Sequence, residues 1–145
     1  MQKSTLFLWI AAAIILILVL ALVVGYRIKG QLLDGDGMVN RYAQITQDEA
    51  KRMMQEEDCV IVDVRRTDEY AAGHIPGAIC IPNETIGEEP PAQLPDKRQT
   101  ILVYCRSGNR SKQAAQKLFD MGYTDIFEFG GILDWTGETV TGTQP

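Results

Sequence analysis

The residues of this sequence that could do chemistry gather around Cys105, in the stretch YCRSGNRS. Cys105 ends the apolar run Thr100–Cys105, whose length and β-branched residues are typical of a buried strand. Arg106 and Arg110 follow it closely, and Gly108 lies between them. A cysteine that serves only for packing has no need of two cations and a tight turn beside it. The stretch therefore predicts a reactive thiol.

A helix is predicted to begin directly after this stretch, over Ser111–Met121. Ligands of open parallel sheets bind at the carboxyl ends of the strands, and Cys105 is expected at such an end. Backbone N–H groups at a helix start favour negative charge, and Gly108 lets the chain bend so that several of them converge. Such surroundings lower the pKa of a cysteine from about 8.5, so we expect Cys105 to be a catalytic thiolate.

The same hydrogen-bond donors would form a small bowl for an anion of sulfur, phosphorus or arsenic. The bowl is expected to span six residues, Cys105–Arg110, and its two arginines would attract and hold the anion. The residues predicted to bind the substrate are Arg106, Ser107, Gly108, Asn109, Arg110 and Ser111.

The elements that must position this bowl alternate along the chain. Strands are predicted at Tyr42–Ile45, Cys59–Val64, Ala78–Ile81, Thr100–Cys105 and Asp125–Phe129. Helices are predicted at Gln47–Glu56, Thr67–Gly73, Ser111–Met121 and Ile132–Gly137, and Glu84–Lys97 is expected to be an irregular loop. Apolar strands separated by helices indicate an α/β fold, in which helices cover both faces of a parallel five-stranded sheet.

The N-terminal part of the chain has a different composition. Leu6–Val24 contains 19 consecutive apolar residues without a charge, enough for a helix of about 28 Å, close to the bilayer core of roughly 30 Å. The apolar part of a secretory signal is shorter, so we expect an uncleaved transmembrane anchor over residues 1–26. A flexible linker over 27–40, a catalytic domain over 41–140 and a disordered tail over 141–145 would follow.

The side of the membrane depends on the basic residues that flank the span. Lys3 precedes it, whereas Arg27, Lys29 and Arg41 follow it. This asymmetry favours a single-pass protein of the cell membrane with its catalytic domain on the cytoplasmic side. A short N-terminal anchor can also export the domain behind it, so both orientations stay open.

Composition excludes several other classes of function. The net charge of −5 argues against a nucleic-acid partner, which usually requires a basic surface. Three cysteines cannot complete a disulfide framework within one chain. The absence of a C-x-x-C pair and the presence of a single histidine, His74, argue against a structural zinc site, so no metal is expected.

Taken together, five segments of this sequence resemble the single-domain rhodaneses of the thiosulfate sulfurtransferase family. They occur in the order of the family and extend over nearly all of Ala43–Trp135. The segments are VDVR (Val62–Arg65), EYAAGHIPGAICIP (Glu69–Pro82), YCRSGNRS (Tyr104–Ser111), DMGY (Asp120–Tyr123) and GGILDW (Gly130–Trp135).

The resemblance implies a rhodanese-like fold and an enzyme that carries sulfur on Cys105. The thiolate would attack the sulfane sulfur of thiosulfate or of a persulfide donor, and a Cys105 persulfide would pass that sulfur to a thiol or another thiophilic acceptor. Its partners would thus be a small anionic sulfur donor and a thiol acceptor, and a protein partner is possible. No metal or organic cofactor is implied.

Residues outside the bowl are expected to support the fold. Asp63 and Arg65 are predicted to form an ion-pair network with Glu69, His74 to belong to a structural turn near the site, and Trp135 to pack beneath the loop. The full set of supporting residues is Asp63, Arg65, Glu69, His74 and Trp135.

The two remaining cysteines are expected in strands. Cys59 is interpreted as an inert core thiol. Cys80 could take part in redox chemistry with Cys105 only if the fold brought the two together, which spacing alone does not decide.

Two alternative functions remain open at this point. The first alternative is a cysteine-dependent phosphatase or arsenate reductase of related fold. Phosphatases, however, use the spacing C-x5-R, whereas four residues separate Cys105 from Arg110 in this sequence. The smaller bowl favours a sulfur atom over a phosphoryl group. The other alternative is a membrane-tethered sulfur carrier or binding module for a protein partner, which would use the same persulfide.

Overall fold

The computed structural model describes residues 40–56 and 58–145, and residues Arg41–Pro145 form one compact unit. The predicted anchor Leu6–Val24 and almost all of the predicted linker 27–40 lie outside the described residues. Within the described part of the chain, no helix is long and apolar enough to cross a membrane.

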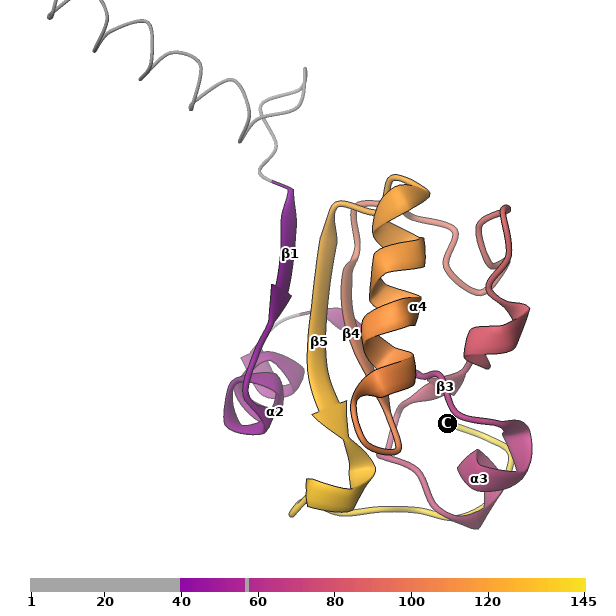
Figure 1. Ribbon diagram of the computed structural model, residues 1–145. Helices are drawn as coiled ribbons and strands as arrows, with labels where there is room; N and C mark the ends of the chain where they lie inside the picture. Colours follow the sequence, from indigo (N-terminus) through magenta and orange to yellow (C-terminus); the bar gives the residue numbers. More distant parts are fainter. Residues whose placement is uncertain (1–39, 57) are drawn as a thin grey trace, which may run out of the picture. The chain divides into compact units, whose positions relative to one another are not determined.

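A single sheet of five strands forms the centre of the domain (Figure 1). The order of the strands is β1–β5–β4–β2–β3, and all four pairings are parallel. The prediction of a parallel five-stranded sheet is therefore confirmed. The strands are β1 (Arg41–Gln44), β2 (Cys59–Asp63), β3 (Ile79–Cys80), β4 (Thr100–Cys105) and β5 (Asp125–Gly131).

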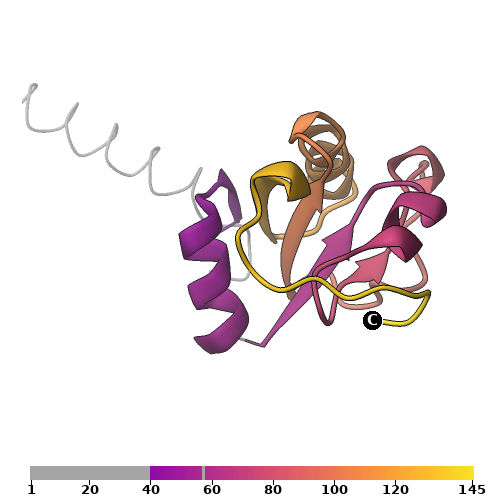
Figure 2. The same cartoon turned by 90° about the horizontal axis from the view of Figure 1, so that it is seen from below.

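Helices cover both faces of the sheet, as Figure 2 shows from below. Helix α4 packs on one face, and helices α2 and α3 pack on the other. Two short 3-10 turns, η1 and η2, complete the structure. The elements are α2 (Gln47–Glu56), α3 (Thr67–Ala72), η1 (Asn83–Thr85), α4 (Asn109–Asp120) and η2 (Ile132–Asp134).

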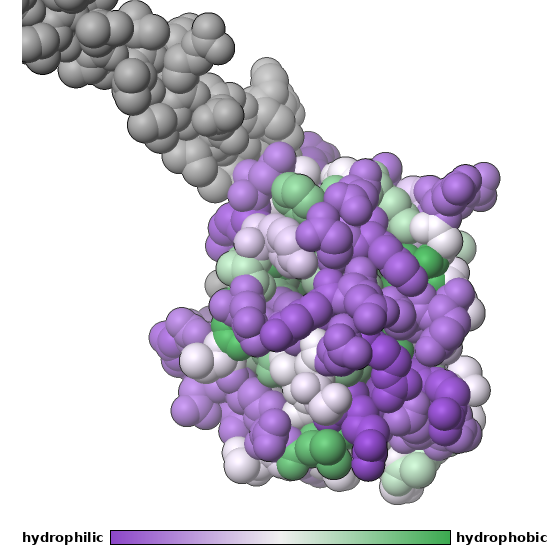
Figure 3. All heavy atoms as spheres, viewed as in Figure 1, coloured by the Kyte–Doolittle hydropathy of each residue, from purple (hydrophilic) through white to green (hydrophobic). Residues whose placement is uncertain are grey.

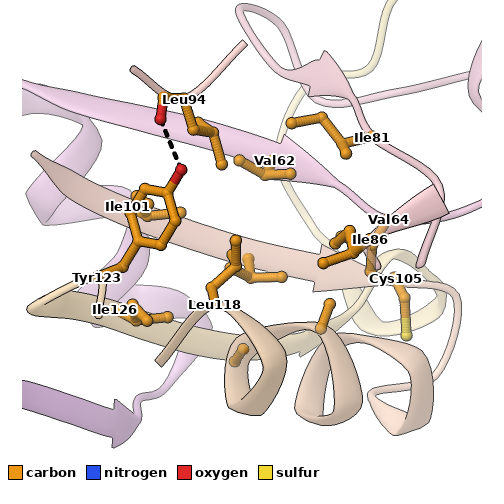
Figure 4. Packing of buried hydrophobic residues seen from close by; sticks show 13 residues of the cluster. Val62, Val64, Ile81, Ile86, Leu94, Ile101, Cys105, Leu118, Tyr123 and Ile126 are labelled. Atoms are coloured by element: carbon orange, nitrogen blue, oxygen red, sulfur yellow. Dashed lines mark hydrogen bonds between the residues drawn. The ribbon is translucent and has the colours of Figure 1, made fainter. Parts of the chain in front are cut away.

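Each face of the sheet has its own hydrophobic core, because successive strand residues point to opposite sides. In β4, Ile101, Val103 and Cys105 face α4, whereas Leu102 and Tyr104 face α2 and α3. Figure 4 shows the α4-side core, in which the Tyr123 hydroxyl closes one end by donating to Leu94 O at 2.6 Å. Cys105 lies at the other end of this cluster.

Several boundaries differ from the prediction, and three of these differences have a local reason. Strand β3 is shorter than expected because Ala78 N donates to Ile75 O in a turn. Helix α4 begins two residues early, at Asn109, directly after Gly108 with its positive φ of 96°. The last predicted helix is only a 3-10 turn, closed by the bond from Trp135 N to Ile132 O.

The C-terminal residues, for which a disordered tail was predicted over 141–145, make contacts with helix α3 and the turn behind it. His74 and Val140 pair as an antiparallel bridge, and Gly142 N donates to Ala71 O at 3.0 Å. Gln144 O lies 3.0 Å from Nε2 of His74. These contacts tie the chain end to the domain.

The surface seen in Figure 3 is mostly hydrophilic, and its hydrophobic residues are scattered. Among the described residues, only Tyr42 and Leu133 are large hydrophobic side chains with high exposure, at 38% and 62%. Isolated apolar side chains of this kind are normal on a protein surface.

Candidate active site

Cys105 is the last residue of β4, a strand enclosed by β5 on one side and β2 on the other. The residue is 1% exposed, and its sulfur lies close to the first turn of α4 (Figure 4). The backbone N–H of Gly108 donates to Cys105 Sγ at 3.1 Å. The thiol thus lies at the carboxyl edge of a parallel sheet, next to a helix start, as the sequence predicted.

Two opposing effects act on the acidity of Cys105. Burial raises the pKa of the thiol, because the charged form loses contact with water. Hydrogen bonds from the Ser111 side chain and from the backbone amides of Ser111, Ser107 and Gly108 favour the thiolate. These bonds outweigh burial, and the pKa of Cys105 falls below its ordinary value of 9.0. The structure therefore favours the thiolate form of Cys105.

A bulge in β5 shapes the loop that surrounds the sulfur. Val103 pairs with Glu128 but Cys105 pairs with Gly131, so two steps along β4 face three along β5. The extra residue is accommodated near Gly130, which has a positive φ of 92°. Gly131 then lies so close to the loop that a Cβ there would overlap the carbonyl oxygen of Arg106. Only glycine permits this approach.

Arg110, predicted to bind substrate, is held by an ion pair with helix α3. Its Nη1 and Nη2 donate to the two carboxylate oxygens of Glu69 at 2.7 and 2.9 Å. The hydrogen bond from Arg110 holds the pKa of Glu69 down at about 2. The paired guanidinium also feels the charge of Cys105, so Arg110 joins α3 to the sulfur site.

The other predicted bowl residues divide into exposed and buried groups. Arg106, Ser107 and Asn109 are exposed, and the guanidinium of Arg106 has no carboxylate partner among residues 40–56 and 58–145. Gly108 and Ser111 are buried beside the sulfur. The structure thus brings all six predicted residues into one loop and helix start, with Arg106 as its exposed cation.

The predicted ion-pair network of Asp63, Arg65 and Glu69 forms only in part. Arg65 Nη2 contacts Asp63 Oδ2 at 2.6 Å and also donates to Gly73 O at 2.6 Å. Glu69 pairs instead with Arg110 because α3 and α4 both begin at the same edge of the sheet. The buried pair Asp63–Arg65 therefore anchors the turn after α3, separately from the sulfur site.

His74 and Trp135 contact other parts of the fold. The His74 ring is fully buried and stacks on Tyr70, with ring centroids 3.7 Å apart, and its Nδ1 lies 3.0 Å from Tyr70 O. Trp135 packs against Phe129 and lies under the ammonium of Lys51, on the face of the sheet opposite to Cys105. Trp135 was expected to pack beneath the loop that follows Cys105. It lies on the other face of the sheet instead.

The remaining cysteines have surroundings unlike those of Cys105. Burial raises the pKa of Cys80 to about 11, and the neighbouring charge of Asp63 adds to this effect. Cys59 lies half-buried at the start of β2, with its Sγ 3.9 Å from Met53 O. Within residues 40–56 and 58–145, no three His, Cys, Asp or Glu side chains are grouped to hold a metal ion.

Sequence reasoning missed one polar residue of the site, Glu128 in β5. Its carboxylate is 2% exposed and accepts a hydrogen bond from Ser111 Oγ at 2.6 Å. A glutamate within the apolar strand Asp125–Gly131 was the available signal, because a charged residue is rarely buried without a specific partner.

Comparison with known proteins places this geometry in a family. The family model described as "Rhodanese-like domain" matches residues 46–138. Thiosulfate sulfurtransferase PspE of Escherichia coli strain K12 is 41% identical over 73 residues, which are 50% of this chain and 70% of that protein. The tRNA uridine(34) hydroxylase of Yersinia enterocolitica is 30% identical over 126 residues, but the chain spans only 35% of its length.

Solved structures give the same result. A rhodanese from E. coli, solved with anions, has a TM-score of 0.54 and 38% identity, and the match covers 59% of this chain and 100% of that one. A thiosulfate sulfurtransferase from Pseudomonas aeruginosa has a TM-score of 0.61 and 27% identity, over 68% of this chain and 20% of that one. By its motifs, its fold and these similarities, the chain belongs to the rhodanese-like domain family.

Proposed function

We propose that this protein is a sulfurtransferase that moves a sulfane sulfur from thiosulfate or a persulfide donor to a thiophilic acceptor. The observation that carries this proposal is the Cys105 sulfur, whose pKa is lowered by Ser111 and by the loop amides at the start of α4. The similarity of this chain to PspE, a thiosulfate sulfurtransferase, supports thiosulfate as the donor to test first.

In the first step the Cys105 thiolate attacks the outer sulfur of thiosulfate. A new S–S bond forms to Cys105, the bond between the two sulfurs of thiosulfate breaks, and sulfite leaves with the electron pair of that bond. The loop amides that stabilise the thiolate can then stabilise negative charge on the transferred sulfur. The enzyme is left with a Cys105 persulfide.

In the second step an acceptor removes the outer sulfur. Cyanide or a thiolate attacks it, the S–S bond to Cys105 breaks, and the thiolate of Cys105 is regenerated. No external oxidant or reductant is needed, because each step exchanges one nucleophile for another at the same sulfur.

The exposed cation of Arg106 is proposed to attract the anionic donor. Arg110 is already paired with Glu69, so its charge is partly compensated. Arg106 is exposed beside the loop, where a guanidinium can bind sulfonate oxygens through charge-assisted hydrogen bonds. This division of roles between the two arginines refines the expectation that both hold the donor.

Intact mass spectrometry tests the proposal directly. After incubation with thiosulfate, the protein should gain the mass of one sulfur atom, and addition of cyanide should remove it with release of thiocyanate. The Cys105→Ser variant should gain nothing. A wild-type protein that gains no sulfur but hydrolyses an aryl phosphate or reduces arsenate would contradict the sulfurtransferase and favour the phosphatase-like alternative.

A sulfur carrier for a protein partner would pass the first part of this test and differ in the second. Its persulfide would form but would persist in the presence of cyanide and small thiols. Rapid turnover with small acceptors therefore distinguishes the enzyme from a carrier.

We also propose that Leu6–Val24 anchors the protein in the cell membrane as a single span. Its length and lack of charge support this, and the basic residues after it favour a cytoplasmic catalytic domain. The full chain should remain with membranes after a carbonate wash. A reporter that is active on one side only, joined to the C-terminus, would determine the orientation.

A further inference from the structure

Glu128 is a buried carboxylate that the proposed reaction does not use. Its Oε1 accepts hydrogen bonds from Ser111 Oγ at 2.6 Å and from Gly130 N at 2.9 Å. Its Oε2 has no hydrogen-bond partner among the described residues. Burial of a carboxylate with one unsatisfied oxygen costs free energy, so Glu128 depends strongly on these two donors.

The hydroxyl of Ser111 has more acceptors around it than it can serve. Its Oγ lies 2.6 Å from Glu128 Oε1, 3.0 Å from Gly108 O and 3.3 Å from Gly130 O. The same hydroxyl contributes to the lowered pKa of the Cys105 thiol, while Gly108 N is the donor that lies at hydrogen-bond distance from Sγ. A serine hydroxyl carries a single proton, so a strong bond to one acceptor weakens the bonds to the others.

We propose that Glu128 is a positioning residue that competes with Cys105 for the single hydroxyl proton of Ser111. When the hydroxyl points to Cys105, the thiolate gains a donor in addition to the loop amides. When the hydroxyl points to Glu128, the sulfur keeps only the backbone donors. The proposal rests on the proposed function, because it concerns the sulfur that would react.

This competition fits the movement of charge during sulfur transfer. In this structure the hydroxyl of Ser111 lies 2.6 Å from Glu128 Oε1. While the negative charge is on Sγ of Cys105, rotation of the hydroxyl toward the sulfur stabilises that charge. In the persulfide the charge lies on the outer sulfur, and Sγ becomes a neutral atom that attracts a donor less. Ser111 then turns to Glu128, and it turns back when the outer sulfur leaves. The hydroxyl rotates, and no covalent bond changes.

Other charged and titratable groups also surround this pair. Arg110 of α4 lies close enough to feel the charge of Cys105, and Glu69 of α3 compensates Arg110. Tyr42 of β1 is near enough to Glu128 for that carboxylate to contribute to its raised pKa, after burial as the larger cause. Any pH test must therefore keep these three groups unchanged.

The test replaces Glu128 and follows the pH dependence of Cys105 alkylation. Glu128→Gln keeps the shape, removes the charge and offers an N–H to Ser111 Oγ, so the serine proton becomes available to the sulfur. The pH midpoint of iodoacetamide reaction at Cys105, read by peptide mass mapping, should fall by at least about half a pH unit, which is about threefold more thiolate below the midpoint. An unchanged or higher midpoint would overturn the proposal.

A double-mutant cycle shows whether Glu128 acts through Ser111. Ser111→Ala alone should raise the midpoint, because the sulfur loses a donor. In that background Glu128→Gln should have less than half of its single effect. If the full effect persists, Glu128 acts by its charge alone and the competition for the proton does not exist.

Matched controls separate this effect from loss of folding. Asp125→Asn changes another buried carboxylate of β5, at the opposite end of the strand, and should leave the midpoint unchanged. If Glu128→Gln does not fold, Glu128→Asp should still lower the midpoint, because its shorter side chain holds Ser111 less well. Alkylation reports the thiol whether or not sulfur is transferred. A shifted midpoint without sulfur loading would therefore contradict the proposed function and leave this inference intact.

Discussion

Two thiols lie at the same edge of the sheet, Cys105 at the end of β4 and Cys80 at the end of β3. Their surroundings shift the pKa of the two thiols in opposite directions. Burial raises the pKa of both thiols. At Cys105 the hydrogen bonds from Ser111 and the loop reverse this effect. At Cys80 the charge of Asp63 adds to it, and the pKa rises to about 11.

The difference lies in where the chain goes after each cysteine. After Cys80 it stays extended, so Ile81 N and Asn83 N donate to the carbonyls of Asp63 and Val64. Pro82, between them, has no N–H to offer. After Cys105 the chain turns into α4, whose first amides have no partner within the helix and converge on the sulfur. The Ser111 hydroxyl and the free backbone amides therefore distinguish the thiol of lowered pKa from the thiol of raised pKa.

The largest predicted effect is the separation of the two thiols by pH. Alkylation of Cys105 should reach half of its maximal rate below pH 9, whereas the rate at Cys80 should still be rising at pH 10, since its pKa is about 11. Peptide mass mapping follows both residues in one sample, and differences in access change the maximal rates but not the midpoints. Equal midpoints would mean that the loop amides do not act on Cys105.

A second test disturbs only the loop around Cys105. Gly131→Ala places a Cβ against the backbone of Arg106 and Ser107. The free energy of unfolding should fall by about 1–3 kcal/mol, as in other overpacked sites, and sulfur loading should be lost. The midpoint of Cys105 should rise, while that of Cys80 should not move. Gly87→Ala is the control, because a Cβ there meets no atom within 4 Å. Normal loading by Gly131→Ala would show that the close approach is not required.

A third test concerns the ion pair of the Cys105 region, between Glu69 and Arg110. The bond from Arg110 lowers the pKa of Glu69 from 4.5 to about 2, so the pair stabilises the folded state above pH 4.5 and loses this effect as the pH falls toward 2. Glu69→Gln should reduce the free energy of unfolding by about 1 kcal/mol at pH 7, and this difference should shrink between pH 4.5 and pH 2. Urea unfolding at several pH values measures it, with Glu88→Gln as an exposed control. A difference that does not change with pH would contradict the pairing.

The smallest effect is expected at Cys80. Its Sγ has only a weak contact with Arg65 O at 3.8 Å, so Cys80→Ser should load sulfur at the wild-type rate. Intact mass spectrometry over a time course of thiosulfate addition measures this. Slower loading would show that Cys80 takes part in the reaction after all.

Much of the fold follows from local pattern. The apolar runs at β2 and β4 predict strands of a parallel sheet. Such a strand is buried on both faces, so nearly all of its residues are apolar. The capping box formed by Thr46 and Glu49 marks the start of α2, and the structure shows the bond from Glu49 N to Thr46 Oγ1 at 3.2 Å. Cys105 was predicted as the nucleophile because the donors that act on it follow within six residues of the chain.

The parts that were missed depend on distant pairs. Glu69 and Arg110 are far apart in sequence, and they meet because two helices begin at one edge of the sheet. Glu128 is paired with Ser111 only because the bulge in β5 and the first turn of α4 come together. Local pattern cannot choose between possible partners for a charged residue, so Glu69 was assigned to the nearer Arg65.

The parallel direction of all five strands gives the domain a polarity. The chain enters the sheet at Arg41, the first residue of β1, and Cys105 is the last residue of β4. Parallel strands begin at one edge and end at the other, so the point of entry and the Cys105 sulfur lie at opposite edges of the sheet, about 20 Å apart for a strand of this length. The strand ends beside Cys105 are therefore not the ones at which the chain enters the sheet.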